Sequence, residues 1–224
     1  MSLDKELFIS NILNLNRTIA EEIFKSVKYP WEVLPILSNF IIELLSRLMS
    51  SKYERLEENI LVAKSSKISK TAELNGPLIV DEGAEIRHCA FIRGNAIIGK
   101  NAVVGNSTEI KNSILFDNVQ VPHYNYVGDS ILGYKSHLGA GCIISNVKAD
   151  KKNVCILCQG EKINTGLRKF GAIVGDEAEV GCNSVLNPGT IIGRQSRIYP
   201  LSSVRGVIED NSIYKSKDNI VKIK

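Results

Sequence analysis

Aliphatic side chains recur every six residues along most of this chain, beginning at Val62. The first run has nine aliphatic residues without a miss: Val62, Ile68, Leu74, Val80, Ile86, Ile92, Ile98, Val104 and Ile110. A period of six fits neither a helix nor a simple alternating strand, and it is typical of hexapeptide repeats, in which three hexads complete one coil. The chain is therefore predicted to be mainly β, a left-handed parallel β-helix of hexapeptide repeats whose stacked coils share one core.

The six-residue period changes register twice and is interrupted once. It continues at Leu115, Val121 and Val127, then at Leu132, Leu138 and Ile144, and after a gap at Val174, Val180, Leu186, Ile192, Ile198 and Val204. Irregular segments on such scaffolds are where sites are commonly built. The interruption predicts an extended loop at about 147–171, with a hairpin from Asn153 to Thr165.

The first quarter of the chain follows a different pattern. None of the 17 glycines precedes Gly76, and apolar residues recur at helical spacing from Phe8 to Leu48. We expect an N-terminal α-helical segment over 1–58, the β-helix over 59–212 and a C-terminal tail over 213–224. The helices are interpreted as a packing or trimer-stabilising cap over the first coil, with recognition of a partner as the alternative.

Composition argues against several classes of protein. The 28 basic and 24 acidic residues leave a net charge of +4, without a basic stripe, so no nucleic-acid partner is expected. The N-terminus lacks the apolar run of a signal peptide, and charges interrupt Trp31 to Met49, so we expect a cytoplasmic protein without membrane contact. Five scattered cysteines favour reduced thiols, and the lone Cys155-x-x-Cys158 pair favours strand packing over a zinc site.

The stretch VPHYNYVGDS, residues 121–130, interrupts this aliphatic pattern with His123 and two tyrosines. A surface histidine without a function is the commoner case on composition alone. The alternative is a general base, because the ordinary pKa of imidazole lies near neutrality.

Residues 121–151, VPHYNYVGDSILGYKSHLGAGCIISNVKADK, resemble the acetyltransferase domain of the bifunctional N-acetylglucosamine-1-phosphate uridyltransferase/glucosamine-1-phosphate N-acetyltransferase family. Shared features are a His-x-x-Tyr-x-Gly-Asp segment, a Gly-Ala-Gly turn and a following Asn. Residues 164–176, NTGLRKFGAIVGD, are similar to sugar-1-phosphate nucleotidylyltransferases of archaea and many bacteria. The resemblance covers about Val80 to Val204 and implies a homotrimer with sites between subunits and acetyl-CoA as the acyl donor.

The resemblance also implies a role for individual residues. His123 matches the general base that acts on the amino group of the sugar, and Asn146 matches an amide near the reacting groups. The implied contacts to the sugar phosphate are Arg93, Lys111, Tyr126, His137 and Lys152, and those to acetyl-CoA are Ala140, Cys182 and Pro200. His137 and Cys182 depart from the asparagine and serine usual in the family. Without the resemblance, solvated charge would be the preferred interpretation of Arg93, Lys111 and Lys152.

The expected function is therefore an acetyl-CoA-dependent N-acetyltransferase acting on an amino sugar phosphate similar to glucosamine-1-phosphate. No pyrophosphorylase activity is expected, because the family's glycine-rich nucleotide loop has no counterpart before residue 76. One alternative is a non-catalytic trimeric scaffold or sensor that binds a sugar nucleotide. Another is a zinc protein similar to the γ-class carbonic anhydrases, since His88 and His123 share the third hexad place; His137, however, is too far along the chain for that family's spacing.

Overall fold

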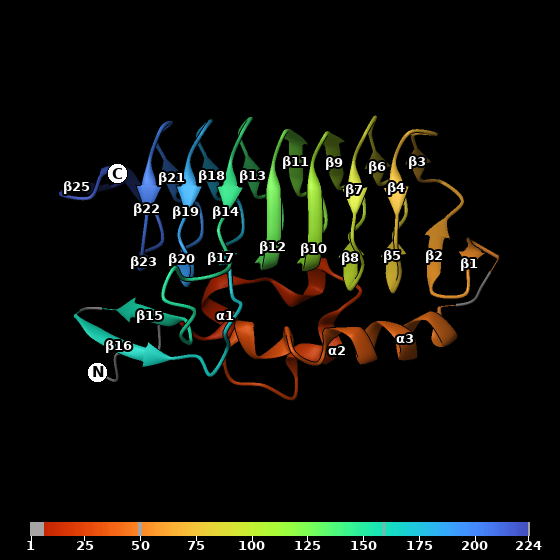
Figure 1. The fold of residues 1–224 in the computed structure, drawn as a ribbon, viewed down its shortest axis with the longest axis horizontal. Coiled ribbons are helices and arrows are strands. Elements are labelled where there is room, and N and C mark those ends of the chain that lie inside the picture. Colours follow the sequence, from red (N-terminus) through yellow and green to blue (C-terminus); the bar gives the residue numbers. More distant parts are fainter. Residues whose placement is uncertain (1–6, 49–50, 159, 224) are drawn as a thin grey trace.

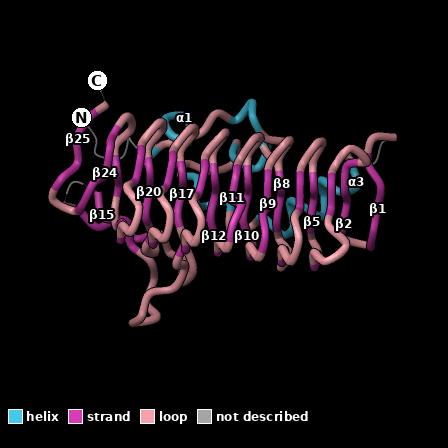
Figure 2. Tube along the Cα trace, turned by 90° about the horizontal axis from the view of Figure 1, so that it is seen from above, coloured by secondary structure: helices cyan, strands magenta, loops and turns pink. Residues whose placement is uncertain are grey.

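The computed structural model describes residues 7–48, 51–158 and 160–223. Short strands follow one another around successive coils, and the coils stack in a row with strands of neighbouring coils parallel (Figures 1 and 2). The prediction of a parallel β-helix of hexapeptide repeats with an N-terminal helical segment is confirmed. Within the part of the chain that the structure describes, no helix is long and apolar enough to cross a bilayer.

The β-helix has three faces. The first face contains β2 (Ile60–Ala63), β5 (Leu78–Val80), β8 (Ala96–Ile98), β17 (Ala172–Val174), β20 (Thr190–Ile192) and β23 (Val207–Ile208). The second face contains β3 (Lys67–Ile68), β6 (Glu85–Ile86), β9 (Val103–Asn106), β11 (Gln120–His123), β13 (His137–Leu138), β18 (Glu179–Val180), β21 (Arg197–Ile198) and β24 (Ser212–Ser216). The third face contains β4 (Glu73–Leu74), β7 (Phe91–Ile92), β14 (Ile143–Ile144), β19 (Val185–Leu186) and β22 (Ser203–Val204). Two longer strands, β10 (Glu109–Leu115) and β12 (Tyr126–Leu132), run from the third face onto the first.

The aliphatic residues of the hexads form the core inside the coils. All of them are buried except Ile68 and Leu74, which are half-buried in the first coil. Each of the two register changes in the sequence corresponds to a coil that is one residue shorter than the regular coils. Leu78 pairs with Ala96, 18 residues on, whereas Ala96 pairs with Ser113, only 17 residues on. Losing one residue makes β10 and β12 continuous around the corner between the third and first faces.

The first face is covered by other segments. Its outward-pointing residues Ile79, Ile97, Ile114 and Ile131 are as fully buried as the inward ones, so this face needs an apolar partner. The cover is the helical segment, which runs alongside the coils in Figure 1 and comprises α1 (Ile9–Ile12), η2 (Leu15–Arg17), α2 (Glu21–Phe24), η3 (Pro30–Val33) and α3 (Leu37–Arg47). Because α3 contacts β5 and β8, the cap predicted over the first coil is corrected to a layer along the first face.

The predicted hairpin in the extended loop is confirmed. β15 (Cys155–Cys158) pairs antiparallel with β16 (Glu161–Asn164) and contacts β23, so the loop covers the later coils of the first face. The backbone of Leu157 comes so close to Gly206 that a Cβ at this glycine would lie 2.9 Å from the Leu157 carbonyl oxygen. The rings of Trp31 and Phe170 lie 5.9 Å apart and join the loop to the helices.

At both ends of the β-helix, the structure differs from the predicted domain boundaries. The last helix ends at Arg47, and β1 (Tyr53–Glu57), inside the segment predicted to be helical, pairs antiparallel with β2. At the other end, the predicted tail contains β25 (Asn219–Lys222), which forms an antiparallel hairpin with β24. Each end of the stack therefore finishes in an antiparallel strand.

We expect Tyr53→Phe to destabilise the first coil. The Tyr53 hydroxyl donates a hydrogen bond of 2.5 Å to fully buried Asp81, whose second oxygen has no partner among the described residues. Removing the donor leaves a buried carboxylate less satisfied, so the free energy of unfolding should fall by about 1–3 kcal/mol in urea denaturation. Tyr199→Phe, at an exposed tyrosine, should change it by less than about 0.5 kcal/mol.

The same pair predicts a dependence on alkaline pH. Burial, followed by the hydrogen bond to Asp81, raises the pKa of Tyr53 in the folded state. A group whose pKa is raised on folding stabilises the fold while it is protonated, and that stability is lost as pH rises above the unfolded value of about 10. Wild-type protein should therefore lose more stability than Tyr53→Phe above that pH; parallel losses would contradict this role of Tyr53.

Candidate active site

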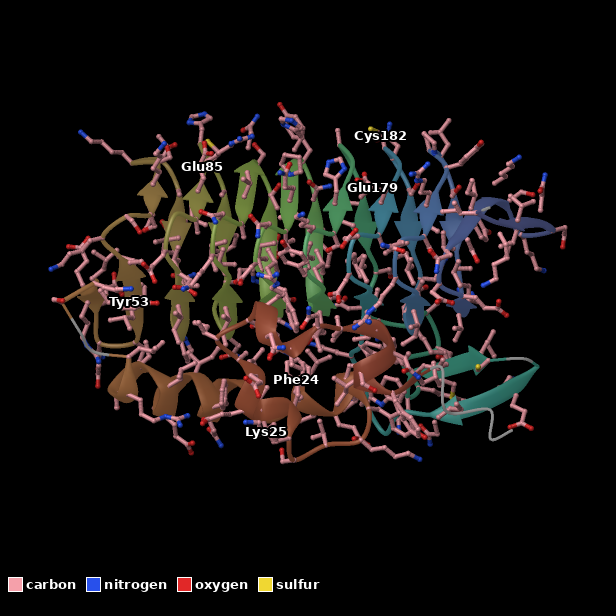
Figure 3. The ribbon with its side chains drawn as sticks, turned by 180° about the vertical axis from the view of Figure 1, so that it is seen from behind. Phe24, Lys25, Tyr53, Glu85, Glu179 and Cys182 are labelled. Atoms are coloured by element: carbon pink, nitrogen blue, oxygen red, sulfur yellow. The ribbon has the colours of Figure 1, made fainter. Side chains whose placement is uncertain are left out.

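One edge of the β-helix, between its second and third faces, brings four of the predicted site residues into one column. The backbone hydrogen bonds Gly141 N–H to His123 O (3.0 Å), Asn183 N–H to Ala140 O (2.8 Å) and Leu201 N–H to Cys182 O (2.9 Å) stack successive coils here. His123, Ala140, Cys182 and Pro200 therefore follow one another along this edge, which we call the donor edge. Figure 3 shows Cys182 on the opposite side of the coils from Phe24 and Lys25, away from the helical layer.

His123 ends strand β11 and is exposed. Its backbone N–H donates to the side-chain oxygen of Asn125 at 3.1 Å, and buried Asn125 in turn donates to Gly139 O at 2.8 Å. Its ring has no hydrogen-bond or ion-pair partner among the residues that the structure describes. The backbone at His123 is fixed while the imidazole is available to a ligand.

A polar cluster lies near the start of β12, at the corner between the third and first faces. We define it as Lys111, Asn112, Tyr126, Asp129 and Asn146. The Asp129 side chain is its centre: it accepts hydrogen bonds from Asn112 at 2.8 Å, Asn146 at 2.5 Å and Lys111 at 3.3 Å. The Asn146 amide also donates to the Tyr126 hydroxyl at 3.2 Å. Asp129 is only 4% exposed, so this carboxylate holds its neighbours from inside the fold.

The coil geometry explains why these residue types occur at this corner. Asn112 and Asp129 have left-handed backbones, with φ of 46° and 49°, a conformation that Asn and Asp tolerate better than most residues. They lie in consecutive coils that pair Lys111 with Gly128. Stacking of the coils therefore places the amide of Asn112 against the carboxylate of Asp129.

Gly128→Ala should disrupt the cluster without unfolding the chain. A Cβ at Gly128 would lie 2.6 Å from the Tyr126 hydroxyl and 2.7 Å from the Asn146 amide nitrogen, so both side chains must move. Because small displacements of positioning groups are costly, we expect turnover to fall by about 100-fold. Circular dichroism should show a retained β-helix; full activity of this variant would show that the Tyr126–Asn146 contact is not needed.

Arg93 extends the polar cluster along the third face from its member Tyr126. Burial raises the pKa of the Tyr126 hydroxyl, which keeps it protonated and able to donate to a ligand while it accepts from Asn146. Glu109 pairs in register with Tyr126 and binds Arg93 at 2.7 Å. Arg93 therefore belongs to the coil two before that of Tyr126, and its guanidinium reaches Glu109 in the coil between them.

Two of the predicted substrate contacts lie apart from the polar cluster within one chain. His137 is on the second face, where its Nδ1 lies 3.0 Å from a Glu179 carboxylate oxygen. Lys152 is exposed in the extended loop, and its backbone N–H donates to Asp150 at 3.1 Å. Among the described residues, no hydrogen bond or ion pair joins either side chain to Lys111, Tyr126 or Asn146.

Asp129 and Glu109 are the site residues that sequence reasoning missed. Asp129 is part of the Gly-Asp pair in VPHYNYVGDS, so its signal was present, but nothing in the spacing showed that it would be buried under three donors. Among the described residues of one chain, no group of three or more His, Cys, Asp or Glu side chains could hold a metal ion. The five cysteines form no disulfide bond there.

The chain matches known proteins over most of its length. The family model of the GMPPB C-terminal domain matches residues 74–174, which include every predicted site residue except Cys182 and Pro200. The bifunctional protein GlmU of Methanococcus maripaludis is 34% identical over 216 residues, covering 88% of this chain and 48% of that protein. The chain is similar in sequence to about half of the length of the bifunctional GlmU proteins. The resemblance to their acetyltransferase domain, predicted from the sequence, is confirmed.

The chain spans about half the length of the curated GlmU relatives it matches. A second kind of relative, the bifunctional sugar-1-phosphate nucleotidylyltransferase/acetyltransferase of Sulfurisphaera tokodaii, is 39% identical over 88 residues, 39% of this chain and 22% of that protein. The name of this second relative includes an acetyltransferase, which is the enzyme class predicted from the sequence.

Solved structures of acetyltransferases are more distant. PerB from Caulobacter crescentus, in complex with CoA and GDP-perosamine, is 18% identical and covers 69% of this chain and 52% of its own, with a TM-score of 0.31. The acetyltransferase domain of PglB from Neisseria gonorrhoeae, in complex with acetyl coenzyme A, is 12% identical. The match covers 84% of this chain and 66% of that domain's chain, with a TM-score of 0.30.

Proposed function

We propose that this GlmU relative transfers an acetyl group from acetyl-CoA to the amine of an amino sugar phosphate or of a nucleotide-linked amino sugar. The observation that carries the proposal is the position of His123, exposed and with no ring partner in the described part of the chain, between two sets of groups. The donor edge continues from it through Ala140, Cys182 and Pro200, and the polar cluster begins three residues after it at Tyr126.

His123 would act as the general base. Its ring accepts a proton from the amine as the nitrogen attacks the thioester carbonyl carbon. The carbon–sulfur bond then breaks, and the imidazolium returns this proton to CoA, which leaves as the thiol. Imidazole suits this step because its ordinary pKa lies near neutral pH. Most of the remaining rate would come from holding the two substrates side by side.

The backbone at Ala140 is suited to the oxyanion of this reaction. Of the Gly-Ala-Gly turn named from the sequence, Gly139 N–H already donates to Val180 O at 2.7 Å and Gly141 N–H to His123 O at 3.0 Å. Ala140 N–H has no acceptor within the described residues. We therefore assign the oxyanion contact to Ala140 rather than to the whole turn, as a preorganised donor.

The polar cluster and Arg93 would bind the acceptor sugar. Lys111 and Arg93 supply positive charge for a phosphate, and each is held in place by a carboxylate partner. The Tyr126 hydroxyl and the Asn146 amide supply neutral contacts beside them. A homotrimer would allow residues such as His137 and Lys152, which lie apart in one chain, to complete a site formed with a neighbouring subunit.

The proposal is tested by measuring release of free CoA thiol from acetyl-CoA against a panel of amino sugar 1-phosphates and UDP-linked amino sugars. Turnover with one acceptor class, and none with the corresponding sugar that lacks the amine, is the expected result. Binding of acceptor and acetyl-CoA by calorimetry without turnover on any panel member would instead indicate the non-catalytic alternative.

A further inference from the structure

A second group with catalytic geometry lies on the same edge as His123, nearer the first coil. It consists of Thr71, His88 and Cys89, all exposed, at the turns between the second and third faces. His88 O accepts Ser107 N–H, and Asn106 pairs with His123 in the next coil. The group therefore lies two coils before His123, about 10 Å away at the usual strand spacing.

Hydrogen bonds order the three side chains as nucleophile, base and orienting hydroxyl. The Cys89 sulfur lies 3.2 Å from His88 Nε2, and His88 Nδ1 lies 2.7 Å from the Thr71 hydroxyl. The Thr71 oxygen also accepts the Cys89 backbone N–H at 3.2 Å and lies 2.9 Å from the Ser69 hydroxyl. Both neutral tautomers of His88 satisfy these contacts; in the one with the proton on Nδ1, Nδ1–H donates to Thr71 and Nε2 is left to accept the thiol proton.

Another exposed thiol on this edge provides the contrast. Cys182 stands on the donor edge itself, where the proposed acetyl-CoA would bind, yet its sulfur has no hydrogen-bond partner among the described residues. Thiol reactivity depends on access to the thiolate, which a neighbouring base promotes. Cys89 has such a base and Cys182 lacks one.

We propose that Cys89 is a self-acylation site, activated by His88 and loaded from an acyl thioester. The inference rests on the proposed use of acetyl-CoA by this chain. His88 Nε2 takes the thiol proton, and the Cys89 sulfur attacks the thioester carbonyl carbon. A carbon–sulfur bond to Cys89 forms, the bond to CoA breaks, and the CoA thiolate takes the proton from His88. No oxidant or reductant is needed, because one thioester replaces another.

The test is peptide mapping by mass spectrometry after incubation of the whole chain with acetyl-CoA in the absence of any acceptor sugar. We expect the peptide with Cys89 to gain one acetyl group much faster than the peptide with Cys182. His88→Asn should slow acetylation of Cys89 by about 100-fold, the usual contribution of a positioned base, and Thr71→Val should slow it less. Equal rates at Cys89 and Cys182, or an unchanged rate in His88→Asn, would overturn the proposal.

Sugar acetylation measured on the same samples separates this inference from the proposed function. His123→Ala should lose sugar acetylation and keep acetylation of Cys89, whereas His88→Asn should do the reverse. A wild-type chain that acetylates the sugar but leaves Cys89 unmodified would refute the self-acylation site alone. A chain that acetylates Cys89 but no sugar would support the site and count against the proposed transfer to sugars.

Discussion

His123→Ala should abolish acetyl transfer while leaving the β-helix folded. The ring of His123 is exposed and has no partner among the described residues, so its removal opens no cavity and leaves no buried group unpaired. If the imidazole is the general base, kcat should fall by about 100-fold to 10,000-fold, with little change in KM for the acceptor. Steady-state release of CoA thiol measures both constants.

Gln120→Ala is the matched control for this variant. Gln120 lies in the same strand, β11, is exposed like His123, and belongs to neither the donor edge nor the polar cluster. We expect it to keep wild-type turnover. If His123→Ala retains wild-type kcat, His123 is a surface histidine, the commoner case for a histidine judged from composition alone.

Asp129→Asn should reduce both stability and activity. Asparagine keeps the shape of the side chain and tolerates the left-handed backbone at this position, but it removes the charge that pairs with Lys111. It also replaces one acceptor oxygen with an NH2 group, which then faces the donor of either Asn112 or Asn146, since these two amides bind different oxygens of Asp129. Breaking a buried network from its centre should lower the free energy of unfolding by about 2–3 kcal/mol.

The loss of activity should exceed what destabilisation explains. At a temperature where Asp129→Asn is still folded, we expect KM for the acceptor to rise, because Lys111 and Asn146 lose the group that positions them. Glu177→Gln is the control: Glu177 is also a carboxylate in a left-handed corner conformation, but it is exposed. Its unfolding free energy should change by less than about 0.5 kcal/mol. Equal effects of the two variants would contradict a special role for Asp129.

Most of the β-helix could be predicted from the sequence because the residues of its core recur at a fixed period. The hexad residues from Val80 to Val204 are inward and buried, and even the two register changes correspond to real 17-residue coils. The hairpin in the extended loop was also predictable, since its strands are short and local.

The covering layer on the first face could not be placed from the hexads alone. A visible signal was the pair of adjacent aliphatics in each first-face strand, such as Ile97 and Ile98, both fully buried. Such a pair means that the face is apolar on both sides and must be covered, but the period does not say by which segment. The helices also had a plausible alternative position over the first coil.

The site was predictable in residue type and only partly in geometry. The motif gave His123, Tyr126 and Asn146, and the structure joins Tyr126 and Asn146 through hydrogen bonds to the same network. Burial of Asp129 depends on how three consecutive coils stack. The spacing of residues along the sequence does not predict this stacking in enough detail to show which side chains it buries. The positions of His137 on the second face and of Lys152 in the loop depend on coil geometry in the same way.

The central claim is that the amine of a sugar accepts an acetyl group at this site, and product analysis tests it most directly. The wild-type chain is incubated with acetyl-CoA and the acceptor selected from the panel, and the sugar product is examined by mass spectrometry and NMR. We predict one acetyl group on the nitrogen of the sugar, formed in amounts equal to the CoA released and absent with His123→Ala. Acetylation of a hydroxyl, or release of CoA without an acetylated sugar, would contradict the account.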